Sequence, residues 1–513
     1  MGQGKICVSV CGRSVEETLA KIERAEEFAD VIEIRFDCLS DEEFDVRDKE
    51  KTVTTIRQIF ARNREAQYLT TFRPKDQGGY REITRQERLN FWDSGSSDGW
   101  ADLEEDVIGS VRAESRETRI CSHHDFSGVP ENLDDIYDRL KNTGADVVKI
   151  AVQIDEASYA IPIWKLLNKS APSGDAFIPI AMGEAGKWTR ILGLAHGAFM
   201  TYASLETGSE TAPGQISAED MIDVFRVKEL DRDTDVYGII AGDTSYTASP
   251  FLHNAAFKVR KLNSVFVPLQ VADLAGFMRR MVKPHTREID LNFKGFSVTN
   301  PHKQSIIEYL DHVDDAAKTI GAVNTVKFEG GKLSGFNTDA PGFITPLRAR
   351  FGDLAGARVA IAGAGGAARA CVYALKQERA DVEILARDGA KAEALAAEFG
   401  TRSNDLATNN ERSNTDFSNF DIIVNATPLG TKGSRQNETI ATADKLKDVK
   451  LVYDLIYNPA ETRLMHEARS AGVDTLGGLE MMISQGTKQF EIWTGLDAPV
   501  EEMTAAVKKR LNL

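Results

Sequence analysis

The sequence predicts an α/β chain in which an N-terminal (β/α)8 TIM barrel is followed by a second, separate α/β half. Three observations predict this. The chain has 513 residues, and a single hydrophobic core stops growing near roughly 250–300 residues. Eight β-rich runs alternate with helix-period stretches up to about residue 230. The alternation then restarts, and it later reaches a strand, a glycine-rich turn and a helix.

The eight β-rich runs are the expected strands of the barrel. Helix-period stretches such as Ser14–Ala29 and Glu131–Gly144 lie between most of them. Eight strands that alternate with helices over this length are typical of a (β/α)8 barrel. The runs span Lys5–Gly12, Asp30–Asp37, Gln67–Pro74, Gly99–Asp106, Thr118–Phe126, Asp146–Gln153, Phe177–Glu184 and Phe199–Glu206.

Polar residues gather toward the C-terminal ends of these runs, which form the catalytic face of a TIM barrel. A polar residue at one strand end often only caps a turn, but several that converge on one barrel mouth predict a site. His123 and His124 are neighbours on one run, so only one of them can point into the barrel. The residues concerned are Glu33, Arg35, Arg73, His123, His124, Lys149 and Glu184.

Lys149 lies inside the apolar segment VVKIAV. A buried ammonium group is costly, so such a lysine is either paired with an acid or shifted toward its neutral form. A neutral amine attacks ketones and forms a Schiff base. The segment alone leaves two interpretations open, a salt-bridged structural lysine and a nucleophile.

Six segments of the first half, over about residues 5–228, occur in the order found in type I 3-dehydroquinate dehydratases, and this half resembles that family. They are EIRFD (Glu33–Asp37), TFRPKDQGGY (Thr71–Tyr80), SHHDF (Ser122–Phe126), KIAV (Lys149–Val152), MGEAGKWTRILG (Met182–Gly193) and TAPGQ (Thr211–Gln215). The resemblance implies that Lys149 forms an imine with the C3 ketone of 3-dehydroquinate. It selects His124 over His123 as the group that removes the C2 proton and protonates the departing C1 hydroxyl, which gives 3-dehydroshikimate.

The same resemblance implies that Arg190 binds the substrate carboxylate. Thr211 stands where family members commonly have Ser, which preserves the hydroxyl. Gln77 stands where relatives usually carry a Glu that supports the catalytic histidine, so we expect dehydration that works at reduced speed. The residues implied to position the substrate hydroxyls and the closing loop are Glu33, Arg35, Arg73, Thr211 and Gln215.

In the second half, a charged stretch over Val227–Asp235 is the expected linker, and Val236–Asp243 restarts the β/α pattern. Gly356–Leu375 contains a buried strand, a glycine-rich turn close to GxGxxA, and a helix. Such a turn lets the backbone approach a pyrophosphate at a helix N-terminus. Arg387 ends the next strand, where NAD sites often carry an acid, and an arginine suits the 2′-phosphate of NADP.

Seven further segments make residues from about 236 to 513 resemble shikimate dehydrogenase. They are SYTASPFLHN (Ser245–Asn254), VTNPHK (Val298–Lys303), GAVNTV (Gly321–Val326), GFNTDAPGF (Gly335–Phe343), VNATPLGT (Val424–Thr431), DLIYNPAETRL (Asp454–Leu464) and QGTKQFEIWTG (Gln485–Gly495). The order of the two halves resembles the bifunctional dehydratase–dehydrogenase of plants. The resemblance implies a two-domain α/β dehydrogenase with a substrate domain and a Rossmann NADP-binding domain. The expected domain limits are 1–230, 234–342, 343–480 and 481–513, the last being C-terminal helices that return to the substrate domain.

The resemblance implies that Lys303 and Asp339 relay a proton to the C3 carbonyl oxygen of 3-dehydroshikimate while NADPH delivers hydride, which gives shikimate. The residues implied to bind the substrate are Thr247, Ser249, Thr299, Asn324, Tyr457 and Gln485. Those implied to bind the cofactor are Gly363, Ala364, Gly365, Gly366, Ala367, Arg387 and Thr427.

Three positions depart from the dehydrogenase pattern. Thr247 replaces the first Ser of the family's Ser-x-Ser-Pro, and Tyr246 replaces its usual His. The cofactor loop reads Ala-Arg-Asp rather than Asn-Arg-Thr, and the anionic Asp388 is expected to weaken 2′-phosphate binding. A preference for quinate or NAD in the second half therefore stays open. A catalytically inactive sensor of these metabolites is the alternative from another class, and the presence of Lys149, His124, Lys303 and Asp339 argues against it.

The composition excludes several other partners. The formal net charge is −16, and a surface this acidic repels phosphate backbones and anionic lipids, so we expect neither nucleic acid nor membrane as a partner. The five cysteines lack CxxC spacing and fit neither a disulfide framework nor a zinc site. We therefore expect five reduced thiols, no metal and a cytoplasmic protein.

Overall fold

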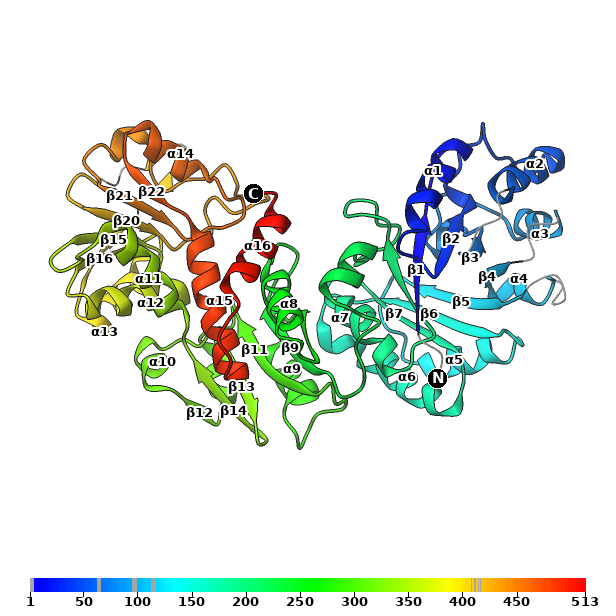
Figure 1. The fold of residues 1–513 in the computed structure, drawn as a ribbon, viewed down its shortest axis with the longest axis horizontal. Coiled ribbons are helices and arrows are strands. Elements are labelled where there is room, and N and C mark those ends of the chain that lie inside the picture. Colours follow the sequence, from blue (N-terminus) through cyan, green and yellow to red (C-terminus); the bar gives the residue numbers. More distant parts are fainter. Residues whose placement is uncertain are drawn as a thin grey trace. The chain divides into compact units, whose positions relative to one another are not determined.

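The computed structural model shows an α/β chain with three large sheets (Figure 1). It divides into two compact units, Met1–Asp235 with Val267–Asn292, and Val236–Phe266 with Phe293–Leu513. The structure describes residues 4–61, 66–94, 99–111, 117–406, 408–409, 412–413, 415 and 417–513.

The first unit is built around an eight-stranded parallel sheet that curls into a near-closed barrel. Its order is β7-β6-β5-β4-β3-β2-β1-β8. The strands are β1 (Lys5–Val10), β2 (Val31–Arg35), β3 (Gln67–Thr71), β4 (Trp100–Glu104), β5 (Arg119–Asp125), β6 (Val147–Gln153), β7 (Phe177–Met182) and β8 (Met200–Ser204). Each lies inside one of the eight predicted runs, and the predicted fold class is confirmed.

Helices follow most of these strands and cover the outside of the barrel. The first begins after Ser14, whose side chain accepts a hydrogen bond from the Glu17 N–H, and it buries Ile22 and Ala25. The helices are α1 (Val15–Ala25), α2 (Lys49–Phe60), α3 (Arg85–Asp93), α4 (Glu105–Ile108), α5 (Leu133–Lys141), α6 (Ile161–Ser173) and α7 (Lys187–Leu192).

The strand period of two builds the barrel interior in layers. An apolar layer near the N-terminal ends includes Trp100 and Val147. Two residues further along the same strands come Asp102 and Lys149, because residues i and i+2 share one face of a strand. The apolar layer seals the bottom of the barrel and leaves the polar residues at its C-terminal mouth.

The expectation of five free thiols is wrong for two cysteines. Cys11 and Cys38 form a disulfide with their Cα atoms 5.4 Å apart. They follow β1 and β2, which are adjacent and parallel, so their C-terminal ends bring the two sulfurs together. Cys7, Cys121 and Cys371 are free and buried.

A mixed sheet in the order β10-β9-β11-β13-β14-β12 follows the barrel along the chain. Its strands are β9 (Asp235–Ala241), β10 (Ser264–Gln270), β11 (Phe293–Val298), β12 (His312–Val313), β13 (Thr325–Glu329) and β14 (Lys332–Phe336). The helices near it in sequence are α8 (Ser249–Val259), α9 (Leu274–Phe277), α10 (Asp315–Ile320) and α11 (Asp339–Phe351).

A parallel sheet in the order β17-β16-β15-β20-β21-β22 follows. Numbered along the chain this is 3-2-1-4-5-6, the order of a Rossmann fold, whose ligand crevice opens beyond the first strand. The strands are β15 (Arg358–Ala362), β16 (Asp381–Ala386), β17 (Arg402–Asp405), β20 (Ile422–Asn425), β21 (Leu451–Asp454) and β22 (Asp474–Leu476), with β18 (Thr408–Asn409) and β19 (Arg412–Ser413) as a separate pair. The helices are α12 (Gly366–Gln377), α13 (Gly389–Phe399), α14 (Arg463–Ser470), α15 (Gly478–Thr494) and α16 (Val500–Leu511).

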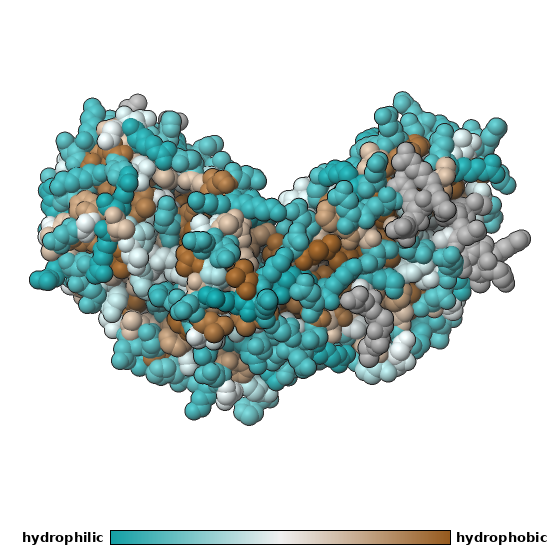
Figure 2. All heavy atoms as spheres, in the orientation of Figure 1, coloured by the Kyte–Doolittle hydropathy of each residue, from teal (hydrophilic) through white to brown (hydrophobic). Residues whose placement is uncertain are grey.

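Hydrophilic residues cover most of the face shown in Figure 2, and hydrophobic residues occupy smaller areas between them. Within the described part of the chain, no helix is both long enough and apolar enough to cross a bilayer.

Candidate active sites

The barrel mouth holds a pocket of about 140 Å³. Strand alternation places its side chains at the C-terminal ends of the strands, as expected for the catalytic face. The pocket brings together all eight site residues predicted in the first half, namely Glu33, Arg35, Arg73, His124, Lys149, Arg190, Thr211 and Gln215.

Lys149 is buried in β6 and is paired with an acid. Its Nζ donates a hydrogen bond to Asp102 Oδ2 at 2.8 Å and lies 4.1 Å from the centre of the Tyr202 ring. Of the two readings that the sequence left open, the structure shows the paired state of the lysine. The paired lysine still lines the pocket.

Arg73 contacts the same carboxylate oxygen of Asp102 as Lys149. Its Nη2 lies 2.6 Å from Asp102 Oδ2, and its Nη1 contacts Glu104 at 2.9 Å and Ser122 Oγ at 2.6 Å. Burial alone raises the pKa of Asp102, but the charges of Arg73 and Lys149 outweigh it and hold that pKa well below its usual range. Asp102 is therefore ionised at neutral pH.

Glu33 and Arg35 belong to β2 and line the pocket, where Glu33 offers a hydrogen-bond acceptor and Arg35 a donor. Ser9 Oγ and Thr71 Oγ1 donate hydrogen bonds to Glu33 at 2.6 and 2.9 Å. The Arg35 guanidinium donates two hydrogen bonds to the Asp37 carboxylate, at 2.9 and 2.7 Å. Both pocket side chains are thus held in fixed orientations, which suits the recognition of hydroxyl groups.

His124 and His123 face opposite sides of β5, as strand geometry requires. His124 lines the pocket and His123 does not. Burial is the main cause that lowers the pKa of His124 well below its usual value, and the charges of Arg73 and Lys149 lower it further. His124 is therefore a neutral imidazole, able to accept a proton.

Arg190 is 2% exposed and has no carboxylate partner among the described residues. Its Nη1 and Nη2 make long bonds of 3.4 and 3.3 Å to the carbonyl oxygens of Tyr202 and Pro213, and its Nε has no partner. Burial lowers its pKa to about 10. A buried guanidinium without an anion is costly, so this position favours an anionic ligand. Thr211 and Gln215 lie in the same pocket and bond to each other, since the Thr211 N–H donates to Gln215 Oε1 at 2.8 Å.

The sequence analysis missed Ser9 and Tyr202, which line this pocket, and Asp102, which accepts the hydrogen bond from Lys149. Asp102 and Glu104 occupy positions i and i+2 of one predicted strand, so their shared face was a usable signal. The sequence gives no comparable signal for Ser9 or Tyr202.

The second unit holds a pocket of about 210 Å³. Ala367, from the start of α12, also lines it, so the glycine-rich turn opens onto the same space. The pocket brings together all eight catalytic and substrate-binding residues predicted in the second half, namely Thr247, Ser249, Thr299, Lys303, Asn324, Asp339, Tyr457 and Gln485.

Lys303 and Asp339 form a hydrogen-bonded ion pair, with Nζ 2.5 Å from Oδ2. The other oxygen of Asp339 accepts a bond of 2.8 Å from Asn324 Nδ2. Asn324 is itself fixed, because its Oδ1 accepts a bond of 2.7 Å from the Thr338 N–H. The carboxylate thus orients a lysine ammonium in the pocket, an arrangement that can donate a proton to a carbonyl oxygen.

The predicted cofactor turn lies at the switch point of the Rossmann sheet. Gly363 has a φ of +118°, and a Cβ there would lie 3.0 Å from the Ala426 carbonyl oxygen, so glycine is required. Gly365 is the N-cap residue of α12 and Gly366 its first residue, which leaves the backbone open at a helix N-terminus. Thr427 lies beside this turn, and its Oγ1 donates to Asn425 Oδ1 at 2.6 Å. These residues, with Ala364 and Ala367, fit a dinucleotide pyrophosphate.

Arg387 is exposed directly after β16, and the described structure shows no hydrogen bond or ion pair to its side chain. Asp388 is engaged elsewhere. Its side chain accepts a hydrogen bond from the Lys391 N–H at 3.2 Å as the N-cap of α13, and it pairs with Lys391 Nζ at 3.2 Å. The arginine is thus available for a phosphate, while the neighbouring anion has a partner.

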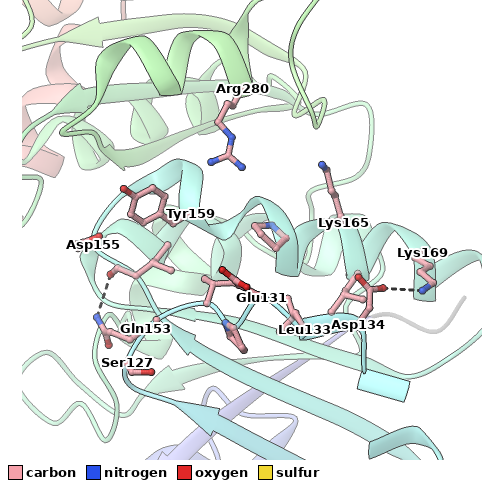
Figure 3. Close-up of a pocket in the computed structure, with 16 residues that line it drawn as sticks. Ser127, Glu131, Leu133, Asp134, Gln153, Asp155, Tyr159, Lys165, Lys169 and Arg280 are labelled. Carbon is pink, nitrogen blue, oxygen red and sulfur yellow. Dashed lines mark hydrogen bonds and ion pairs between the residues drawn. The ribbon is translucent and has the colours of Figure 1, made fainter. Parts of the chain in front are cut away.

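A larger pocket of about 840 Å³ lies elsewhere in the first unit (Figure 3). Its cations have acidic partners. Lys169 pairs with Asp134 at 3.0 Å, and Lys165 and Arg280 both pair with Glu288. This pocket therefore offers none of the unpaired buried groups found at the barrel mouth. Among the residues that the structure describes, no cluster of three or more His, Cys, Asp or Glu is placed to hold a metal ion.

Four family models match the chain. Residues 6–232 match type I 3-dehydroquinase, and residues 239–326 match the shikimate dehydrogenase substrate binding domain. Residues 347–473 match shikimate / quinate 5-dehydrogenase, and residues 478–508 match the shikimate 5′-dehydrogenase C-terminal domain.

Individual proteins are also similar to this chain. A bifunctional 3-dehydroquinate dehydratase/shikimate dehydrogenase, chloroplastic, from Arabidopsis thaliana is 34% identical over 97% of this chain and 83% of its own length. A shikimate dehydrogenase (NADP(+)) from Methanopyrus kandleri is 39% identical over 55% of this chain and 98% of its own. A solved shikimate dehydrogenase in complex with NADP+ is 38% identical, covers 55% of this chain and 97% of that chain, and has a TM-score of 0.49.

Proposed function

Because the chain belongs to the family of bifunctional 3-dehydroquinate dehydratases/shikimate dehydrogenases, we propose that it carries out both of these reactions. The first unit converts 3-dehydroquinate to 3-dehydroshikimate, and the second reduces 3-dehydroshikimate to shikimate with NADPH. The observation that carries the proposal is that each unit gathers its whole set of expected catalytic and substrate-binding residues around one pocket.

In the dehydration, Lys149 attacks the C3 ketone of 3-dehydroquinate, and water leaves as the imine forms. The imine draws electrons from C2, and His124, neutral before the reaction, removes the C2 proton. The resulting imidazolium protonates the departing C1 hydroxyl, and hydrolysis of the imine frees Lys149 and the product. Arg190 supplies the cation that the substrate carboxylate needs, and Glu33, Arg35, Arg73, Thr211 and Gln215 hold its hydroxyl groups and the closing loop.

In the reduction, NADPH supplies a hydride for C3 when it is bound. Lys303 donates the proton to the C3 oxygen, and Asp339 keeps this lysine protonated and oriented. Thr247, Ser249, Thr299, Asn324, Tyr457 and Gln485 bind the substrate carboxylate and hydroxyls. Gly363, Ala364, Gly365, Gly366, Ala367 and Thr427 hold the pyrophosphate region of the cofactor, and Arg387 binds its 2′-phosphate.

Two finer points belong to the proposal. The domain limits of 1–230, 234–342, 343–480 and 481–513 are supported by the four matched segments. A cytoplasmic location was proposed from the few cysteines, but the Cys11–Cys38 disulfide is a bond rare in the cytosol, and the Arabidopsis relative is named chloroplastic. Fractionation of the source cells, with detection of this chain in each fraction, tests the location.

Incubation of the chain with 3-dehydroquinate, followed by identification of the product, tests the proposed function. We expect 3-dehydroshikimate without NADPH and shikimate with it. Accumulation of neither product from a folded preparation contradicts the proposal. The same assay with quinate, shikimate, NAD and NADP decides whether the second unit prefers the alternative acid or cofactor.

A further inference from the structure

The Lys149 nitrogen lies between one carboxylate and one aromatic ring. Asp102 Oδ2 accepts its hydrogen bond at 2.8 Å, and the centre of the Tyr202 ring is 4.1 Å away. Lys149 is 4% exposed and Asp102 is 1% exposed. Both neighbours favour a positive charge on the nitrogen, since the face of an aromatic ring attracts cations.

Within the described part of the chain, the other ionisable groups around this nitrogen accept no hydrogen bond from it. Burial keeps the Cys7 thiol and the Tyr202 phenol neutral by raising their pKa values, and it keeps His124 neutral by lowering its pKa. Arg73 is a cation that shares the same oxygen of Asp102. Glu33 is occupied by Ser9 and Thr71. Asp102 is thus the carboxylate in hydrogen-bond contact with Lys149.

The charge on the lysine nitrogen is the same before and after imine formation. An ammonium and a ketone give a protonated imine and one water, so the nitrogen carries one positive charge on both sides of the step. A carboxylate that stays ionised can therefore stabilise both states. Between them the ammonium releases one proton, the free amine attacks the ketone, and that proton leaves with the ketone oxygen in the departing water. One oxygen of Asp102, Oδ1, is buried and has no partner among the described residues, which leaves an acceptor for the hydrogen-bond changes at the nitrogen.

We propose that Asp102 is a positioning residue for the dehydration, the counterion that stabilises the protonated imine formed at the nitrogen of Lys149. This inference rests on the proposed dehydratase function. The protonated imine is the form that withdraws electrons from C2, so loss of the counterion weakens the electron sink rather than substrate binding. His124 remains the group that moves protons.

Asp102→Asn tests this, because it keeps the shape and removes the charge. Cyanoborohydride reduces a protonated imine and spares a neutral one. The amount of 3-dehydroquinate that it attaches to the enzyme, measured at increasing pH, therefore falls along an alkaline limb where the imine loses its proton. We expect the alkaline limb of labelling to move down by about 1–3 pH units, the usual effect of one nearby opposite charge. We also expect kcat to fall far more than KM rises.

Glu104→Gln is the matched control, since Glu104 also pairs with Arg73, at 2.9 Å, from the same strand. Its alkaline limb should stay at the wild-type pH. Asp102→Glu keeps the charge and should retain that limb even if its rate falls. Asp102→Ser replaces the Asn variant if the latter does not fold, with the same expected shift.

If the alkaline limb of labelling stays at the wild-type pH in a folded Asp102→Asn or Asp102→Ser enzyme, the inference is overturned and Asp102 is merely structural. A shift of the limb in Asp102→Glu as large as the shift in Asp102→Asn also overturns the inference, because the Glu variant still carries the charge. Absence of labelling in the wild-type enzyme contradicts the imine mechanism itself, so the failure of the inference and the failure of the proposed function are separate results.

Discussion

Gln77 accepts a hydrogen bond from the backbone N–H of His124 at 3.1 Å, and the Nδ1 atom of the His124 ring has no partner among the described residues. Gln77 thus fixes the main chain of β5 beside the histidine. It adds no charge that would stabilise the imidazolium formed when His124 takes a proton. The proposed catalytic histidine therefore lacks the carboxylate that the dehydratase pattern leads one to expect at this position.

Gln77→Glu should raise the turnover of dehydration by about threefold to tenfold, a fraction of the roughly 10²–10⁴-fold that general acid–base catalysis supplies. The carboxylate can keep the bond to the backbone N–H and adds a negative charge near the ring. Burial, Arg73 and Lys149 hold the pKa of His124 low, and the new anion opposes them. The limb of the pH–kcat profile on which His124 must be neutral should therefore move to higher pH.

Gln58→Glu, an equal change on an exposed part of α2, is the control and should leave the profile in place. A Gln77→Glu profile identical to the wild type would show that residue 77 does not act on the histidine. A wild-type chain that reduces 3-dehydroshikimate but never dehydrates 3-dehydroquinate would mean that the first unit has lost its activity.

Borohydride added during turnover of 3-dehydroquinate should attach the substrate covalently to Lys149. The lysine is the amine that lines the barrel pocket, 4% exposed and in contact with Asp102. Peptide mapping by mass spectrometry locates the label. Lys149→Ala should abolish it, whereas Lys165→Ala, which removes an exposed lysine of α6, should not. A label on any other lysine would refute the imine mechanism proposed for this unit.

Lys303→Ala should lower the reduction of 3-dehydroshikimate by about 10²–10⁴-fold, the range for loss of a general acid. Dehydration should stay nearly intact, because the two pockets lie in separate compact units and share no residue. Both activities are measured on one preparation. The exposed Lys332→Ala on β14 serves as the control for changes in the same unit. A parallel loss of dehydration in a folded Lys303→Ala chain would contradict the assignment of two independent sites.

The sequence predicted the barrel well because its strands follow local rules. The predicted run Asp146–Gln153 contains β6 (Val147–Gln153), and the polar residues toward the ends of the runs lie around the barrel pocket. Alternation also showed that His123 and His124 could not share one side of the sheet. These features depend on neighbours within one strand, which a single sequence displays.

What the sequence did not predict depends on strands that meet only when the barrel closes. The partner of Lys149 comes from β4, 47 positions earlier in the chain. The Cys11–Cys38 disulfide joins the ends of β1 and β2, and cysteine spacing alone gave no sign of it. Gln77, in the turn after β3, likewise accepts its hydrogen bond from the backbone of His124 in β5. Pairings of this kind require the register of the folded sheet.

Arg387→Ala should raise the KM for NADPH by about 10- to 150-fold, the equivalent of the roughly 1.5–3 kcal/mol of a charged hydrogen bond. The KM for NADH should hardly change, because NADH lacks the 2′-phosphate. Arg387 is exposed after β16 without a partner in the described structure, so its removal leaves no group unpaired. Calorimetric titration with NADP+ and NAD+ checks the same difference without catalysis.

Asp388→Asn removes the negative charge next to Arg387 and so tests how much that charge weakens NADP+ binding. Asp388 already caps α13 and pairs with Lys391 at 3.2 Å, so its charge is partly neutralised before any cofactor binds. We therefore expect NADP+ affinity to rise by less than about threefold, because the charge of this exposed carboxylate is screened by water and salt. Arg469→Ala, which removes an exposed arginine of α14, should change neither affinity. Equal losses of NADP+ and NAD+ affinity in Arg387→Ala would show that Arg387 does not recognise the 2′-phosphate. A large gain in NADP+ affinity in Asp388→Asn would show that Asp388, rather than Arg387, sets the preference between the two cofactors.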